Sequence, residues 1–188
     1  MIITIIMETA EQPVKKFTVT SVQDFLDLYD VFFPKIYNFI FRDVWHVETA
    51  EDITATVFEK ALSFIKRHNI VIENFQAWIY KIATNELFSH LRKKGRKKTL
   101  SINDESLNLE NLLPDERQDP SKYADFMDLK RAIGILKPKD ALLVELHYFE
   151  KRDYAELEEI LGERQVTLRS RIHRILQKLE VLLTEDKA

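Results

Sequence analysis

The sequence of 188 residues contains no cysteine. This excludes disulfide bonds, cysteine nucleophiles, and zinc or iron–sulfur sites built from cysteine ligands. Glycine and proline are also scarce, with 3 and 5 residues, whereas hydrophobic residues make up 45% and charged residues 31%. This composition is typical of a helix-rich globular chain and excludes a disordered or fibrous one.

Long hydrophobic runs are missing as well. No apolar stretch has the roughly 20 residues that a membrane span requires. The N-terminal MIITIIM lacks the basic flank and the small-residue cleavage site of a signal peptide, and Met7 is a second candidate for the initiating residue. We therefore expect a cytoplasmic protein with no membrane segment of its own.

Signatures of catalysis and of metal binding are absent from the sequence. It contains no HExxH pair, no GxSxG elbow, no Gly-rich phosphate loop and no DxDxDG loop. Its five histidines are scattered along the chain: His46, His68, His90, His147 and His173. We predict no catalytic residues, no metal site and no cofactor, and hence a protein that is not an enzyme.

Charge is unevenly distributed, although the net charge is only −3. Residues 1–98 carry a net charge of +2 and residues 129–188 carry +1, whereas residues 99–128 carry −6. Residues 99–120 also lack helical periodicity, and they exceed the length of most loops inside one domain. This segment predicts a flexible acidic linker between two domains.

The remaining apolar residues recur at helical spacing, and we see no alternation typical of strands. We predict an all-α fold of two small helical domains. Pro34 predicts a kinked helix or a pair of helices over 24–42, Thr49 is the expected N-cap of the next helix, and Gly162 is expected to end a short helix. The predicted division is an N-terminal tail (1–23), a first domain (24–98), the linker (99–120) and a second domain (121–188).

The region around Gly162 has the pattern of a helix-turn-helix. A short acidic helix is followed by a longer one, about 165–183, which carries basic residues and no acid before Glu180. The face opposite its apolar stripe can reach base edges and phosphates in a major groove. The alternative is a solvated basic face on an ordinary bundle helix. The face comprises Ser170, His173, Arg174 and Gln177, flanked by Thr167 and Arg169.

Two other surfaces invite a functional interpretation. The run RKKGRKK (92–98) follows a helix on which we expect Tyr80, Asn85 and Phe88 to be exposed, a combination that suits single-stranded nucleic acid. The alternative is a solvated helix end stabilised by the helix dipole. An acidic and polar helix face suits protein docking, or is simply solvated; it comprises Glu51, Asp52, Thr56 and Glu59.

In this order, these segments resemble an extracytoplasmic-function (ECF) sigma factor of bacterial RNA polymerase. LYDVFFPKIYNFIFR (28–42) and AEDITATVFEKAL (50–62) are similar to the opening and polymerase-docking helices of region 2. FQAWIYKIATNELFSHLRKKGRKK (75–98) is similar to the helix that binds and melts the −10 element. DYAELEEILGERQVTLRSRIHRILQKLEVLL (153–183) is similar to the helix-turn-helix of region 4, which reads the −35 element.

The resemblance implies a role for each surface. Core RNA polymerase would be bound through its β′ clamp helices and β flap, promoter DNA through both domains, and an anti-sigma factor would hold the protein inactive. Docking would use Glu51, Asp52 and Glu59. The −35 contacts would be Thr167, Arg169, Ser170, Arg171, His173 and Arg174, and the −10 contacts Asn69, Asn74, Lys81, Asn85, Phe88, Arg92 and Lys93.

The sequence departs from the family pattern at several positions. Ala55 and Thr56 replace the common Gln and Glu of the docking helix, and Val166 stands where glycine is frequent. Two other hypotheses fit the residues: a stand-alone helix-turn-helix regulator that binds operator DNA without polymerase, and an all-helical adaptor whose acidic face binds a protein.

Overall fold

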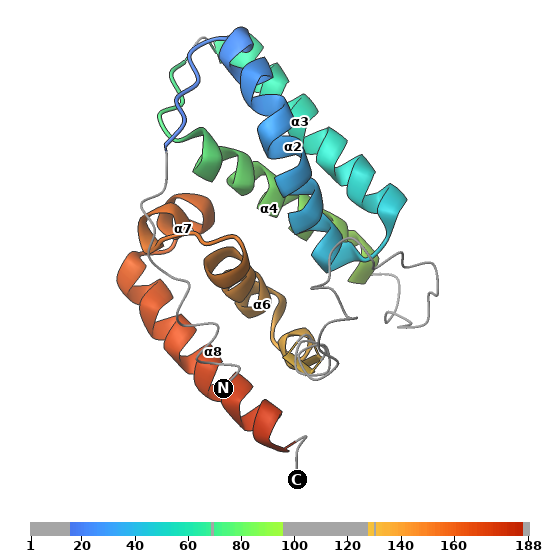
Figure 1. Cartoon of the computed structure of the whole chain (residues 1–188), viewed down its shortest axis with the longest axis vertical. Helices are drawn as coiled ribbons and strands as arrows, with labels where there is room; N and C mark the ends of the chain where they lie inside the picture. Colours follow the sequence, from blue (N-terminus) through green and yellow to red (C-terminus); the bar gives the residue numbers. More distant parts are fainter. Residues whose placement is uncertain (1–15, 69, 96–127, 130, 186–188) are drawn as a thin grey trace, which may run out of the picture. The chain divides into compact units, whose positions relative to one another are not determined.

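The computed structural model describes residues 16–68, 70–95, 128–129 and 131–185. These residues fall into two compact units, and every named element in them is a helix (Figure 1). The prediction of an all-α fold with two helical domains is thus confirmed. The acidic linker at 99–120 lies outside the described residues.

In its described residues, the N-terminal unit packs helices α2 (Val22–Val44), α3 (Val47–His68) and α4 (Phe75–Gly95) around an aromatic core. The ring of Phe75 at the start of α4 meets Phe25 and Phe32 of α2 edge to face, with ring centres 5.9 and 5.3 Å apart. Such pairs add to the stabilisation that burial of the rings provides.

The segment before α2 belongs to this unit. Val19 and Ile72 exchange two backbone hydrogen bonds of 2.9 Å, and the N–H of Phe75 donates to the carbonyl of Phe17 at 2.8 Å. Ser21 then caps α2 in a reciprocal capping box with Asp24. Residues 17–23, which the sequence analysis assigned to the tail, therefore form part of the packing that holds α2 against the loop before α4.

Two local predictions for this unit need correction. Helix α2 is a single helix across Pro34 and not a pair of helices. Pro34 and Asp30 are both exposed, so water can reach the carbonyl that lacks an N–H partner, while Phe32 and Ile36 anchor the helix in the core on either side. Helix α3 begins at Val47 rather than after Thr49, whose N–H donates to Nδ1 of His46 at 3.3 Å.

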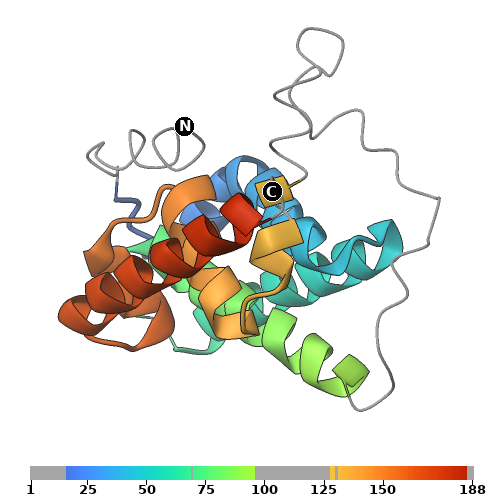
Figure 2. The same cartoon turned by 90° about the horizontal axis from the view of Figure 1, so that it is seen from below.

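Within the described residues, the named elements of the C-terminal unit are α6 (Pro138–Val144), a π-helical turn η2 (Glu145–Phe149), α7 (Tyr154–Leu161) and α8 (Gln165–Glu185). Helix α8 packs against both α6 and α7 (Figures 1 and 2). Gly162 ends α7 as the sequence predicted. Its φ of 70° lies in the left-handed region that favours glycine, and its N–H donates to the carbonyl of Glu158 at 2.9 Å.

Candidate nucleic-acid interface

Helix α8 has a buried face and an opposite polar face. Leu168, Ile172 and Leu179 are buried in the core of the C-terminal unit. Because a helix turns by about 100° per residue, the opposite face is centred between Ser170 and His173. The structure leaves five of the six residues predicted for the −35 element exposed: Thr167, Arg169, Ser170, His173 and Arg174.

The exposed side chains are partly fixed by contacts inside the unit. The Ser170 hydroxyl donates to the carbonyl of Val166 at 3.0 Å, and Nε of Arg174 donates to the carbonyl of Ser170 at 3.4 Å. The guanidinium carbon of Arg169 lies 4.9 Å from the ring centre of Tyr154, the first residue of α7. A guanidinium has five N–H donors, so both arginines keep donors available for a ligand.

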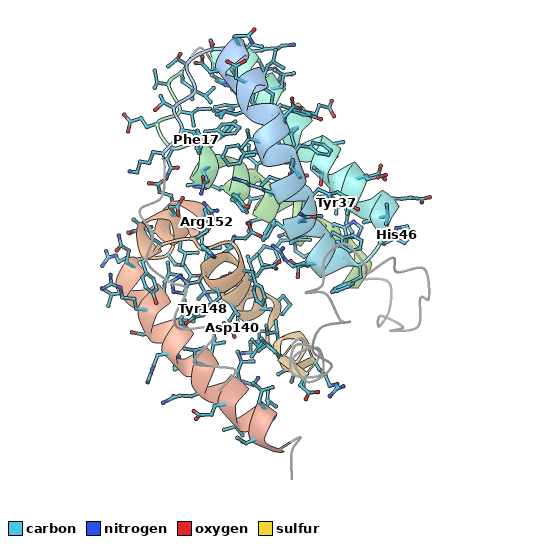
Figure 3. All side chains as sticks on the ribbon, in the orientation of Figure 1. Phe17, Tyr37, His46, Asp140, Tyr148 and Arg152 are labelled. Carbon is cyan, nitrogen blue, oxygen red and sulfur yellow. The ribbon has the colours of Figure 1, made fainter. Side chains whose placement is uncertain are left out.

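Arg171 occupies a different environment. Its side chain is only 17% exposed. Nε donates to Oδ1 of Asp140 on α6 at 2.7 Å, and Nη1 donates to the two carboxylate oxygens of Glu163 at 3.0 and 3.1 Å. Figure 3 labels Asp140 on α6. Arg171 therefore ties α8 to α6 and to the turn through its Nε and Nη1 atoms.

Helix α4 exposes a second polar strip. Lys81, Asn85 and Arg92 are exposed at intervals of four and seven residues, a spacing that keeps them on one side of a helix. Lys93 is exposed next to Arg92, and Phe88 is half-buried. The side chains of residues 94–98, which complete the predicted basic run, lie outside the described part of the chain.

Three other residues near α4 differ from expectation or cannot be placed. Tyr80, expected to be exposed, is fully buried against Phe39, because it lies on the same side of α4 as the core residue Ala83. Asn74 is also buried, and its side-chain oxygen accepts from the N–H of Ala77 at 3.3 Å, which caps the first turn of α4. Asn69 lies outside the described residues.

The predicted docking residues lie on the solvent side of α3. Glu51, Asp52 and Glu59 are all exposed. Beside them, α3 and α4 enclose a shallow hollow lined by Asp52, Ile53, Thr56, Glu86, Ser89, His90 and Lys93. The hollow places Asp52, which is predicted to dock on polymerase, on the same surface as Lys93, which is predicted to contact the −10 strand.

A buried polar cluster around the start of α7 was missed at the sequence level. His147 in η2 is buried, and its Nδ1 lies 2.8 Å from the carbonyl oxygen of Arg152. Its ring packs 4.7 Å from those of Tyr148 and Tyr154. Burial lowers the pKa of His147, against the hydrogen bond to Arg152 and the charge of Asp153, which raise it.

The cluster continues to a buried ion pair. Nη1 of Arg152 lies 3.3 Å from Oε1 of Glu156, and both side chains are at most 10% exposed. Burial raises the pKa of Glu156, and the charge of Arg152 partly offsets this effect. In the sequence, the only sign of this cluster is the spacing of Asp153 and Glu156, which is typical of a capping box. That spacing predicts the start of α7 but not the burial of Glu156.

Within residues 16–68, 70–95, 128–129 and 131–185, no three His, Asp or Glu side chains gather in a way that could hold a metal ion. In the same residues, no helix is both long and apolar enough to cross a membrane.

Comparison with known proteins assigns the two units. The family Sigma-70 region 2 matches residues 28–97, and Sigma-70, region 4, matches residues 126–179. The ECF RNA polymerase sigma factor SigW of Bacillus subtilis is 30% identical over 157 residues, covering 80% of this chain and 83% of SigW. The chain belongs to the ECF sigma factors. The sigma factor SigV of the same species is 29% identical over 150 residues, covering 80% of this chain and 85% of SigV.

A solved structure supports the fold of this ECF sigma factor. The sigma factor RpoE of Bartonella quintana, solved in complex with the anti-sigma factor NepR, superposes with a TM-score of 0.64. It is 22% identical, over 86% of this chain and 98% of that one. Sigma factors are transcription initiation factors that bind core RNA polymerase and direct it to promoters. The family match favours this function over the two other hypotheses, the stand-alone regulator and the protein-binding adaptor.

Proposed function

We propose that helix α8 reads the −35 element through Thr167, Arg169, Ser170, His173 and Arg174. The observation that carries this proposal is the exposure of these side chains opposite a fully packed apolar stripe. A helix held in this way can enter a major groove without losing core contacts. Arg171 is set apart, because its guanidinium is engaged by Asp140 and Glu163.

The N-terminal domain, 24–98, would perform the other two tasks. The exposed acids of α3, Glu51, Asp52 and Glu59, would dock on the β′ clamp helices. The strip on α4 would hold the separated −10 strand, with Phe88 stacking on a base and the cations following the backbone. The residues predicted for this task are Lys81, Asn85, Phe88, Arg92 and Lys93, together with Asn69 and Asn74, which precede α4 in the sequence.

The division into two DNA-binding domains suggests how the protein acts. Each domain offers few phosphate contacts, so free sigma would bind promoters weakly. Core polymerase would be contacted at its β′ clamp helices and β flap. It would hold the two domains, residues 24–98 and residues 121–188, at a fixed spacing, and residues 99–120 would link them. The second DNA contact then becomes intramolecular. Opening of the −10 duplex would come from trapping unpaired bases.

Three further properties are part of the proposal. The protein has no catalytic residue of its own and leaves the chemistry of RNA synthesis to the polymerase. It acts in the cytoplasm, where RNA polymerase operates. It is held inactive by an anti-sigma factor, as the complex of RpoE with NepR suggests for a relative of the same fold.

A run-off transcription assay tests these assignments. The full chain is combined with core polymerase and a library of promoter fragments, and starts that depend on the chain identify the promoter. Arg174→Ala should then weaken −35 binding by about 1–3 kcal/mol if Arg174 contacts a base. Lys139→Ala removes an equal charge from an exposed position on α6 and should leave the −35 footprint intact. An unchanged footprint with Arg174→Ala counts against the assignment.

A further inference from the structure

Val166 is the most exposed large hydrophobic side chain among the described residues, at 75%. It is the second residue of α8 and therefore lies in the helix's N-terminal turn. A single exposed valine is ordinary on a protein surface and requires no explanation by itself. What distinguishes Val166 is its position relative to the DNA-reading side chains.

The geometry of α8 places Val166 close to the middle of the proposed reading face. The buried stripe contains Leu168, Ile172, Ile175 and Leu179. With about 100° per residue, Val166 lies about 30° from the direction opposite this stripe, whereas Thr167 and Arg169 lie about 70° and 90° away. The Ser170 hydroxyl bonds to the carbonyl of Val166, so the two residues share one turn of this face.

An apolar side chain at this point has a specific counterpart in DNA. The N-terminal residues of a recognition helix contact base edges, and the only apolar group on a base edge in the major groove is the C5-methyl of thymine. We propose that Val166 is a specificity-determining residue that recognises the methyl group of one thymine in the −35 element. This inference rests on the proposed contact between α8 and the −35 duplex.

The test removes the methyl group from the DNA and the side chain from the protein. Holoenzyme is assembled from core polymerase and the full chain, and its affinity is measured for the promoter found by run-off transcription. Each thymine of the −35 element is replaced in turn by deoxyuridine, which lacks only the methyl. At one position the affinity should fall about fourfold, the effect of one buried methyl group. Val166→Ala should reduce this preference for thymine, because the shorter side chain loses most of its contact with the methyl group.

Val181→Ala is the matched control, because Val181 is also exposed, at 53%, and lies on the same helix far from its N-terminus. This variant should keep the full preference for thymine. The inference is overturned if no thymine can be distinguished from deoxyuridine, or if Val166→Ala prefers thymine as strongly as the wild type does. If Arg174→Ala weakens the −35 footprint but removal of the thymine methyl groups has no effect, only the role of Val166 is rejected and the proposed function stands. A holoenzyme with no −35 footprint rejects the proposed function itself.

Discussion

Replacing Arg171 with alanine should destabilise the C-terminal unit while leaving the N-terminal unit unchanged. The change removes three hydrogen bonds to two carboxylates, those of Asp140 and Glu163. A hydrogen bond to a charged group contributes about 1.5–3 kcal/mol. The carboxylates are 24% and 33% exposed, so water replaces part of what is lost. We therefore expect the free energy of unfolding to fall by about 2 kcal/mol.

The assay must distinguish the two units. Both tryptophans, Trp45 and Trp78, belong to the N-terminal unit, so tryptophan fluorescence reports on that unit. Far-UV circular dichroism follows the helices of both. The part of the dichroism change that tryptophan fluorescence does not follow reports unfolding of the C-terminal unit. Arg171→Ala should lower the urea midpoint of this transition by about 2 M, if the free energy of unfolding falls by about 1 kcal/mol per M of urea. The fluorescence transition should not move.

The matched control for this prediction is Arg174→Ala. It removes the same charge from the same helix, but from an exposed side chain, and should change stability by less than about 0.5 kcal/mol. Arg171→Lys keeps the charge without the planar guanidinium and should give an intermediate loss. The reasoning is refuted if Arg171→Ala lowers the free energy of unfolding by less than about 0.5 kcal/mol, or if Arg174→Ala lowers it as much as Arg171→Ala does.

Three further predictions follow from individual contacts. Asn74→Ala should lower the free energy of unfolding of the N-terminal unit, followed by tryptophan fluorescence, by about 1 kcal/mol, because it removes the side chain that caps the N–H of Ala77. Asn74→Asp keeps a capping oxygen and should have the stability of the wild type. Equal stability of all three proteins would contradict the capping role. Because burial lowers the pKa of His147 below its usual value of about 6.5, its contribution to stability is present above pH 6.5 and is lost as the pH falls through its folded pKa. Urea titrations at pH 7.5 and 5.5 should show this loss in the wild type and a smaller one in His147→Gln; an equal loss would exclude His147 as its source. Tyr154→Leu should reduce −35 affinity two- to fivefold by removing the ring under Arg169, while Tyr154→Phe keeps that ring and should bind like the wild type.

Much of the fold could be predicted from periodicity and local signals, because these depend on neighbouring residues. The helical class and the end of α7 at Gly162 are examples. Pro34 left a pair of helices open as an alternative, because the cost of a helical proline depends on what surrounds it. Water reaches the exposed face of α2 there, and the aromatic core holds the opposite face.

The candidate site shows where sequence reasoning stops. Tyr80 was expected to be exposed because it precedes a basic run, but its ring packs edge to face with Phe39, 41 residues earlier in the chain. Arg171 was grouped with the DNA contacts by resemblance, although one of its partners, Asp140, is 31 residues away on another helix. The burial of Tyr80 and the ion pair of Arg171 with Asp140 both arise from contacts between distant segments, which neither periodicity nor composition can reveal.

The arginines of α8 show that positive charge alone does not identify a DNA contact. Arg171 and Arg174 are separated by three residues, yet Arg171 lies about 110° from the centre of the exposed face and Arg174 only about 50°. The first is enclosed by two carboxylates and the second points to solvent. Loss of either arginine should abolish or weaken −35 binding, for Arg171 because the unit unfolds more easily and for Arg174 because a contact is missing. Binding data alone therefore cannot separate them, and each substitution on this helix must be measured for stability and for affinity before a residue is assigned to promoter recognition.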